Sequence, residues 1–312
     1  MSENGTRFNV KAKVMPEIAD ALSRLLGDPP QPDSPVLLAG PTASGKSGLA
    51  LELARRQGRA VVNADALQVY DMWRILTARP DAQDCAAAPH FLYGTVGAGA
   101  EWSVGHWLRA MRSILADHPN AVVVGGTGLY FRALTEGLAE IPPTPADVRA
   151  EADALVAGDG IAPLLGGLDP DTRARIDMQN PARVQRAWEV QRATGQGLAA
   201  WQDATPPPLL PLEHATAYLM LPTPEWSASR IASRFEQMIA QGALDEARAV
   251  LPHWAPRAPW AKAIGAPELI AHLQGHISLS EATNAATLAT RQYAKRQRTW
   301  FRARMSGWER LL

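Results

Sequence analysis

The stretch that decides the fold is Gly40-Pro41-Thr42-Ala43-Ser44-Gly45-Lys46-Ser47. It matches the phosphate-binding pattern G-x-x-x-x-G-K-[ST] at every position. An apolar run at 36–39 (VLLA) precedes this loop, and a helix-forming run at 48–56 (GLALELARR) follows it. A strand, a glycine-rich loop and a helix in this order open an α/β unit. The sequence therefore predicts a P-loop, with all eight residues of the motif binding a diphosphate.

The chemistry of this loop follows from its residue types. Its glycines let backbone N–H groups turn inward around a phosphate, and the helix that follows adds its positive N-terminal end. Lys46 supplies a point charge for the terminal phosphate, and the hydroxyl of Ser47 is a ligand for Mg²⁺. The motif thus predicts a diphosphate bound with Mg²⁺, and leaves open whether the rest of the ligand is a nucleoside.

Two further loops carry polar residues directly after apolar runs. Asp65 follows the run at 60–62, and Thr127 follows the run at 121–124. Ligands of open parallel sheets bind at the carboxyl ends of the strands, so both side chains are expected near the phosphate loop. Asp65 is interpreted as a general base or a Mg²⁺ ligand, with a helix N-cap as the alternative. Thr127 is expected to donate to a ligand oxygen, with a plain glycine-rich turn as the alternative. No acidic residue follows Val124, which argues against ordinary ATP hydrolysis.

Proline-rich segments divide the chain. Residues 141–145 (IPPTP) and 206–208 (PPP) flank a helical, arginine-rich region, and 217–221 (AYLML) is expected to return to the sheet as a strand. The predicted fold class is α/β: a P-loop NTPase-like parallel sheet with a small helical insertion domain and a helical C-terminal part. The expected domains are an N-terminal extension (1–34), a catalytic core (35–140 and 213–312) and the insertion (141–212). The extension is expected to be a loosely packed appendage with a short amphipathic helix near 16–26.

The overall composition says little about binding partners, but it does indicate the cellular compartment. There are 31 basic and 31 acidic residues, so a nucleic-acid partner has to be argued from local clusters. The single cysteine, Cys85, excludes an internal disulfide and fits a reducing cytosol. No apolar run approaches the roughly 20 residues of a membrane span, and residues 1–34 lack a signal-like apolar stretch. We expect a cytoplasmic monomer with no membrane contact.

The C-terminal stretch 291–304 (RQYAKRQRTWFRAR) has six basic residues and no acidic one. On a helix, Arg291, Lys295, Arg298 and Arg302 share one face, where like charges repel unless a polyanion relieves them. The interspersed aromatic residues would either pack this helix or stack on bases. A weaker basic cluster lies around Arg183 and Arg186. Two basic patches beside a P-loop predict an RNA partner, and an ordinary solvated helix is the alternative.

Together these motifs resemble the bacterial tRNA dimethylallyltransferases. Six segments in order, between about residues 36 and 302, carry the similarity: GPTASGKS (40–47), NADALQVY (63–70), GGTGLYFRAL (125–134), NPARVQRAWEV (180–190), AIGAPEL (263–269) and TRQYAKRQRTWFR (290–302). The resemblance implies transfer of a dimethylallyl group from its diphosphate to the exocyclic amine of the adenosine 3′ of a tRNA anticodon. It also implies a need for Mg²⁺ and not for ATP.

The resemblance assigns roles to individual residues. Asp65 stands at the family's catalytic carboxylate, Thr127 at the threonine that contacts the bridging oxygen, and Arg230 at an arginine that reaches the diphosphate. The positions that match contacts to the tRNA anticodon stem-loop are Asp65, Ala66, Leu67, Gln68, Arg149, Ala182, Arg183, Val184, Gln185, Arg186, Lys262, Gly265, Lys295, Arg296, Arg298 and Arg302.

The chain departs from the family pattern at Ala66, Phe91 and Ala266-Pro267, where the family has serine, a second histidine and tyrosine with a basic residue.

Two other functional classes remain. An ATP-dependent small-molecule kinase would use Asp65 as a base, but the basic C-terminal helix and the missing acid after Val124 count against it. A non-catalytic RNA-binding protein would not need Asp65 and Thr127 at two strand ends.

Overall fold

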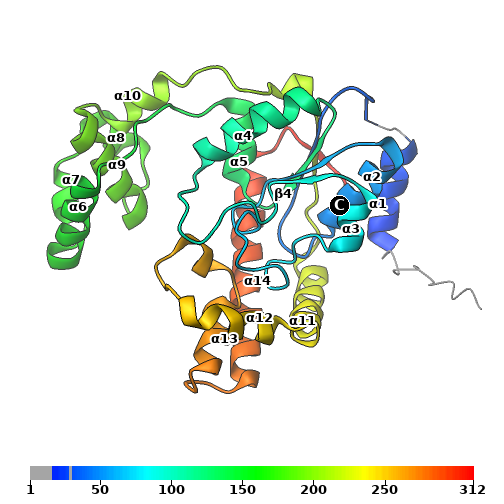
Figure 1. Ribbon diagram of the computed structural model, residues 1–312. Helices are drawn as coiled ribbons and strands as arrows, with labels where there is room; N and C mark the ends of the chain where they lie inside the picture. Colours follow the sequence, from blue (N-terminus) through cyan, green and yellow to red (C-terminus); the bar gives the residue numbers. More distant parts are fainter. Residues whose placement is uncertain (1–15, 28–29) are drawn as a thin grey trace, which may run out of the picture. The chain divides into compact units, whose positions relative to one another are not determined.

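A computed structural model describes residues 16–27 and 30–312. Within this part, six strands form one parallel sheet in the order β3-β2-β4-β1-β5-β6 (Figure 1). Their bounds are β1 Val36–Ala39, β2 Val61–Asn63, β3 His90–Phe91, β4 Val122–Gly125, β5 Thr216–Leu219 and β6 Glu309–Arg310. The parallel α/β fold is therefore as the sequence predicts. The short strand β6 was not expected, because it is two residues long and exposed.

The two central strands, β1 and β4, carry no polar side chain, as expected of parallel strands covered on both faces of the sheet. In β1 and β4 every residue is buried. On one face, Leu38 and Val124 pack with Leu49 and Leu53 of α2 (Lys46–Gln57). Full burial of such side chains contributes about 1.5–3 kcal/mol each, so the sheet holds the loops at its ends rigidly. Helices α3 (Ala82–Ala87), α4 (Val104–Asp117) and α5 (Gly128–Glu136) follow the successive strands.

The first described helix, α1 (Pro16–Gly27), packs against the core. Its Ala21 and Leu25 are 0% and 2% exposed and belong to the same apolar cluster as α2. The guanidinium of Arg24 also donates to the carbonyl of Leu311 over 3.4 Å. The amphipathic helix expected near 16–26 is confirmed, but its description as a loosely packed appendage is wrong for this helix, because Ala21 and Leu25 are buried against the core. The remaining residues of the extension before Pro16, with Asp28 and Pro29, lie outside the described part.

A second apolar cluster organises the helical C-terminal part. It buries Trp73, Phe235, Trp260 and Leu269, together with small residues of α14 such as Ala282. The helices are α11 (Pro224–Ala240), α12 (Ala243–Val250), α13 (Ala266–Leu273) and α14 (Leu279–Arg304), with 3₁₀ turns at Leu212–His214, Leu251–His253 and Pro259–Lys262. Helix α14 begins 12 residues before the predicted basic stretch, at a capping box formed by Ser278 and Glu281.

The described residues form two compact units, one made of Arg132–Pro211 and the other of the described residues before and after that segment. The smaller unit is helical, with α6 (Ala146–Asp159), α7 (Ala162–Gly166), α8 (Pro170–Arg175), α9 (Pro181–Thr194) and α10 (Leu198–Asp203). Its own core contains Ala152, Leu164, Val184 and Ala187. It therefore has the apolar interior of a separate helical body.

Candidate active site

The phosphate loop joins β1 to α2 with two residues in the left-handed region. Ala43 has φ 62° and Gly45 has φ 87°, so the backbone turns sharply before the helix starts at Lys46. A side chain at Gly40 is excluded, since a Cβ there would lie 2.7 Å from the carbonyl oxygen of Met220. A sharp turn of this kind directly before a helix N-terminus is typical of loops that bind phosphate through backbone amides.

A lysine and an arginine side chain contact this loop. Lys46 is half-buried, and its Nζ donates to the carbonyl of Pro41 over 3.2 Å. Burial lowers the pKa of Lys46 to about 8, with Asp65 opposing the shift and Arg234 adding to it. Arg230 of α11 donates from Nε to the carbonyl of Ala43 over 3.0 Å and stacks 4.6 Å above the ring of Trp226. The structure thus brings Arg230 to the phosphate loop.

Arg234 was missed by the sequence analysis. It lies one helical turn after Arg230, and the electrostatic influence on Lys46 and Asp65 puts it beside the same site. Burial lowers its pKa, the charge of Arg230 lowers it further, and Asp65 raises it. The i, i+4 spacing of the two arginines was the available signal, because residues at that spacing share a helix face. A diphosphate would relieve the repulsion between them.

Asp65 is held by the loop that follows β2. Its N–H donates to Oδ1 of the fully buried Asn63 over 2.8 Å, and the amide of Asn63 donates in turn to the carbonyls of Asp65 and Leu92, each over 2.9 Å. One carboxylate oxygen of Asp65 accepts from the N–H of Leu67 over 3.0 Å. Its other oxygen, Oδ2, lies 3.5 Å from the point where a Cβ on Gly126 would stand. One side of the carboxylate is therefore anchored while the other faces the second loop.

Thr127 lies across from this carboxylate, because β2 and β4 are neighbours in the sheet. Its Oγ1 accepts a hydrogen bond from the N–H of Ala66 over 2.9 Å, and its own N–H donates to the carbonyl of Ala64 over 3.1 Å. A hydroxyl has one hydrogen to donate and two lone pairs to accept. With a lone pair used by Ala66, the hydrogen of Thr127 is available to a ligand oxygen. The structure thus brings Asp65, Thr127 and the phosphate loop to one sheet edge.

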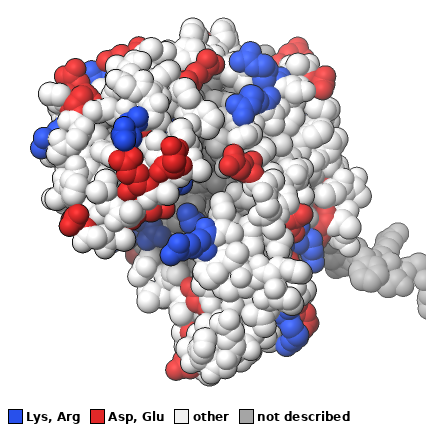
Figure 2. Space-filling model, turned by 60° about the vertical axis from the view of Figure 1, so that its left-hand side comes forward, with Lys and Arg blue, Asp and Glu red and all other residues white. Residues whose placement is uncertain are grey.

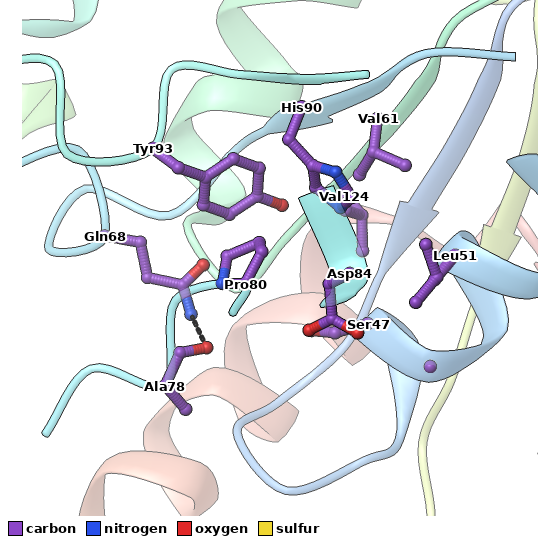
Figure 3. Close-up of a pocket in the computed structure, with 11 residues that line it drawn as sticks. Ser47, Leu51, Val61, Gln68, Ala78, Pro80, Asp84, His90, Tyr93 and Val124 are labelled. Carbon is purple, nitrogen blue, oxygen red and sulfur yellow. Dashed lines mark hydrogen bonds between the residues drawn. The ribbon is translucent and has the colours of Figure 1, made fainter. Parts of the chain in front are cut away.

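A cavity of about 90 Å³ opens beside the first turn of α2 (Figure 3). Ser47 and Asp84 both line it, as do His90 and Tyr93. The side chain of Gln68 forms part of the wall, where its Nε2 donates to the carbonyls of Thr77 and Ala78 over 2.8 and 3.3 Å. Gln68, which the resemblance assigns to tRNA contact, thus uses its side chain within the fold.

The residues around this cavity fit Mg²⁺. Mg²⁺ prefers oxygen ligands and is usually held by one or two carboxylates together with substrate phosphates and water. Ser47 and Asp84 offer a hydroxyl and a carboxylate on the same cavity wall. No group of three or more metal-binding side chains occurs among the described residues. A hydroxyl and a carboxylate would leave the other positions around a Mg²⁺ ion to water and the oxygens of a diphosphate.

The basic helix α14 has the face that its sequence predicts. Lys295, Arg296 and Arg302 are exposed and Arg298 is half-buried. Burial lowers the pKa of Arg298, and the like charge of Arg302 adds to this effect. Figure 2 shows basic side chains in small groups with acidic ones between them on the face it draws, in agreement with a net charge of zero. An attraction for RNA would therefore be local.

Two neighbouring aromatic residues of α14 differ in their surroundings. Phe301 is 1% exposed and packs edge-on against Trp300 at 5.7 Å between ring centroids. Trp300 covers Gly128, where a Cβ would lie 2.0 Å from the ring. Trp300 also lines an apolar groove, together with Lys295, Arg296 and Arg304. Phe301 thus holds the helix in place, while Trp300 both packs against Gly128 and lines the groove.

In the helical unit, a buried carboxylate organises the predicted tRNA-binding residues. Glu189 of α9 is 3% exposed. Its Oε2 lies 3.3 Å from Nη2 of Arg149 and 4.0 Å from Nη1 of Arg186, and its Oε1 accepts from Gln185 over 3.1 Å. Ala182 and Arg183 are exposed on the first turn of the same helix. Residues distant in sequence are therefore gathered on one surface by a side chain that the sequence analysis did not single out.

Two predicted contact residues face inward. Val184 is 0% exposed in the core of the helical unit, so its side chain packs rather than meeting a ligand. Gly265 is buried at the start of α13 with φ 96°, and a Cβ there would lie 2.7 Å from Phe235. Successive side chains on a helix point in different directions, so Val184 faces the core while its neighbours at 183 and 185 point elsewhere. For Gly265 the side chain is excluded by space and by backbone conformation. The nearby Lys262 is exposed.

Comparison with known proteins identifies the family of this chain. A family model described as IPP transferase matches residues 68–304, and one described as isopentenyl transferase matches residues 35–88. The chain belongs to the IPP transferase family. The resemblance seen in the sequence is thereby confirmed. The chain is 61% identical over 302 residues to a tRNA dimethylallyltransferase of Cereibacter sphaeroides, which covers 97% of this chain and 93% of that protein.

Further relatives and solved structures show the same family similarity. The chain is 63% identical over 278 residues to the tRNA dimethylallyltransferase of Dinoroseobacter shibae, covering 88% of this chain and 94% of that one. A solved tRNA isopentenylpyrophosphate transferase of Bacillus halodurans has a TM-score of 0.63 at 28% identity, covering 89% and 90% of the two chains. A eukaryotic dimethylallyltransferase acting on tRNA has a TM-score of 0.74 at 24% identity, covering 86% and 70%, and supports the fold. No helix among the described residues has the length and apolar character needed to cross a membrane.

Proposed function

We propose that this protein transfers a dimethylallyl group from dimethylallyl diphosphate to the N6 amine of the adenosine 3′ of a tRNA anticodon. The observation that carries the proposal is the meeting of three loops at one sheet edge. A phosphate cradle, a carboxylate and a threonine hydroxyl lie together, and the Ala66 N–H joins the last two through Thr127 Oγ1 over 2.9 Å. The names of the close relatives support the same reaction.

The cradle would bind the diphosphate. The loop amides, Lys46, Arg230 and Arg234 all direct positive charge to the region in front of α2. Their largest contribution comes when the bond from C1 of the prenyl group to the bridging oxygen breaks, because negative charge then builds up on the leaving pyrophosphate. Thr127 would donate its hydroxyl hydrogen to that bridging oxygen. These groups are fixed before reaction, so little reorganisation is needed.

Asp65 would act as the general base. The exocyclic amine of adenine is a poor nucleophile because its lone pair is delocalised into the ring. As N6 forms its bond to C1, the amine becomes acidic and passes a proton to the carboxylate. Such a positioned base contributes typically about 10²–10⁴-fold. The products are N6-(dimethylallyl)adenosine, pyrophosphate and a protonated Asp65, which returns its proton to solvent.

Mg²⁺ would be held by Ser47, with Asp84 on the same cavity wall. When bound, the metal supplies neutralising charge to the diphosphate. The target adenine must leave its stack to reach the cradle, a step that costs a few kcal/mol. Lys295 and the exposed arginines of α14, together with the Glu189-centred group of the helical unit, would bind the anticodon stem-loop. The reaction would take place in the cytoplasm.

The test uses purified protein, Mg²⁺, dimethylallyl diphosphate and bulk tRNA from cells that lack this modification. We expect a nucleoside of adenosine mass plus one dimethylallyl group, and equimolar pyrophosphate. An arm with ATP in place of dimethylallyl diphosphate is expected to give no product. Phosphorylated product in the ATP arm, or unmodified tRNA in the main arm, would contradict the proposal.

A further inference from the structure

The side chain of Gln297 bridges the two loops that flank the reacting centre. Its Oε1 accepts a hydrogen bond from the N–H of Thr42 in the phosphate loop, over 2.9 Å. Its Nε2 donates to the carbonyl of Gly126, next to Thr127, also over 2.9 Å. The side chain is 6% exposed, one of few buried polar residues in the described part of the chain. One amide thus spans from the first loop to the second.

The surroundings leave this amide little freedom. A Cβ on Gly126 would lie 2.4 Å from Nε2, so the missing side chain of that glycine makes room for the bridge. On α14, Ala294 and Phe301 are buried on the same side of the helix, at spacings of three and four residues from Gln297. The position of the amide is therefore fixed by α14, and both loops are attached to that helix through it.

The residues on either side of Gln297 face outward. Arg296 is exposed and Arg298 is half-buried, and both belong to the basic stretch proposed to bind tRNA. A rise of about 1.5 Å per residue separates each of them from Gln297 along the helix axis. The side-chain amide of Gln297 is hydrogen-bonded to Thr42 and to Gly126. A shift of α14 on contact with a polyanion would therefore also shift these two loop residues.

We propose that Gln297 is a positioning residue that couples tRNA binding on α14 to diphosphate binding in the cradle. Resting on the proposed function, the inference adds that each substrate raises the affinity for the other. The amide of Gln297 attaches the phosphate loop to α14, so tRNA bound on α14 and a diphosphate in the cradle would each favour the same arrangement of loop and helix. Coupling of this kind is reciprocal and typically amounts to about 5–150-fold in affinity.

The experiment measures tRNA affinity with and without saturating inorganic pyrophosphate and Mg²⁺, in wild type and in Gln297→Met. Methionine has a similar length and packs well, but it offers no equivalent hydrogen bonds. We expect wild type to bind tRNA at least about 5-fold more tightly when the cradle is filled. In Gln297→Met we expect this ratio to fall close to one. Direct repulsion between the two polyanions is present in both proteins, so the difference between them reports the side chain.

Two further variants separate positioning from general stability. Gln237→Met removes an exposed glutamine of α11 and should leave the ratio as in wild type. Gln297→Glu keeps an acceptor for Thr42 N–H and loses the donor to Gly126, so we expect an intermediate ratio. It also takes the place of Gln297→Met should that variant fail to fold. A wild-type ratio near one, or a full wild-type ratio in Gln297→Met and Gln297→Glu, would overturn the inference. Absence of prenyl transfer by wild type would instead contradict the proposed function.

Discussion

The backbone N–H of Ala66 donates to the side-chain oxygen of Thr127 over 2.9 Å, so the loop that carries Asp65 is attached to the loop that carries the hydroxyl. The two loops are 61 residues apart in sequence and meet because β2 and β4 are adjacent. This contact uses an acceptor lone pair of Thr127 and leaves its hydrogen free to be donated. It also sets the distance between the proposed base and the proposed donor to the leaving group.

Thr127→Val tests that double role. Valine keeps the shape but removes the hydroxyl, and a transition-state donor of this kind is worth about 10²–10³-fold in kcat. We expect a loss of that size in single-turnover transfer with little change in diphosphate affinity. Thr127→Ser retains the hydroxyl and should keep most of the activity. Equal rates for the valine variant and wild type would remove Thr127 from the chemistry.

Lys46 gives a prediction about pH. Burial lowers its pKa to about 8, so its neutral form becomes the majority above that pH. The proposed diphosphate contact needs the ammonium, and each neutral site must first take up a proton. Affinity for dimethylallyl diphosphate should therefore fall as pH rises above about 8, by up to tenfold per unit. Calorimetry at pH 8.5 in buffers of different ionisation enthalpy should detect proton uptake.

The matched variant is Lys46→Arg, which stays charged throughout this range. Its diphosphate affinity is expected to be lower than that of wild type because the guanidinium is larger, but its pH dependence should be flat. The same fall of affinity with pH in both proteins would mean that another group titrates. Lys46→Ala should weaken diphosphate binding at every pH while leaving the fold intact.

Arg298 and Arg302 test the RNA-binding face of α14. Replacing both with alanine should weaken tRNA binding and reduce the slope of log affinity against log salt by roughly 0.7–0.9 for each lost phosphate contact. Arg55 and Arg56 on α2 form a control of equal charge, since both are exposed and pair with Glu52. Their double alanine variant should keep the wild-type slope. If the two double variants behave alike, the effect is one of net charge and α14 is an ordinary solvated helix.

Arg59 should matter for stability and not for the reaction. It is 1% exposed, and its guanidinium donates to the carbonyls of Ser34, Asn120 and Gln31 over 2.7, 2.7 and 2.8 Å. Arg59→Met leaves these carbonyls without their donor, and we expect it to lower the free energy of unfolding by about 2–4 kcal/mol. Arg55→Met, at an exposed position, should stay within about 0.5 kcal/mol. Denaturant unfolding measures both.

The site could be predicted from sequence where a parallel sheet brings strand ends together. Asp65 and Thr127 each follow an apolar run, and the rule that ligands bind at carboxyl ends of strands placed them beside the phosphate loop. Gln297 could not be found in this way. It lies 171 residues from Gly126 and stands between two arginines in a stretch that reads as surface. Only the phase of the helix, set by Ala294 and Phe301, turns it inward.

The helical unit shows the same limit. Arg149 and the 182–186 segment were grouped by resemblance, while the reason for their grouping is the buried carboxylate of Glu189. A single glutamate in an arginine-rich helix has no sequence feature that marks it as buried. Likewise, the burial of Ala21 and Leu25 depends on an apolar surface formed by distant strands. In each case tertiary packing decides what the local pattern leaves open.

Asp65 carries the most specific prediction. Asp65→Asn keeps the shape of the side chain, including an oxygen to accept from Leu67 N–H, and removes the proton acceptor. We expect the single-turnover transfer rate to fall by about 10²-fold or more, with tRNA and diphosphate affinities nearly unchanged. Asp65→Glu retains a carboxylate displaced by one methylene and should keep part of the activity.

A Mg²⁺ ligand at Asp65 would behave differently. Its loss would weaken metal-dependent diphosphate binding, and excess Mg²⁺ would restore the rate. A titration of Mg²⁺ at saturating tRNA separates the two roles, because a missing base is not replaced by more metal. The geometry favours the base: Oδ2 of Asp65 faces Gly126, next to Thr127, whereas the carboxylate that lines a cavity with Ser47 is Asp84. Asp84→Asn should accordingly shift the Mg²⁺ dependence, while Asp65→Asn lowers the rate at every Mg²⁺ concentration. Rescue of Asp65→Asn by Mg²⁺, or transfer at the wild-type rate, would show the assignment to be wrong.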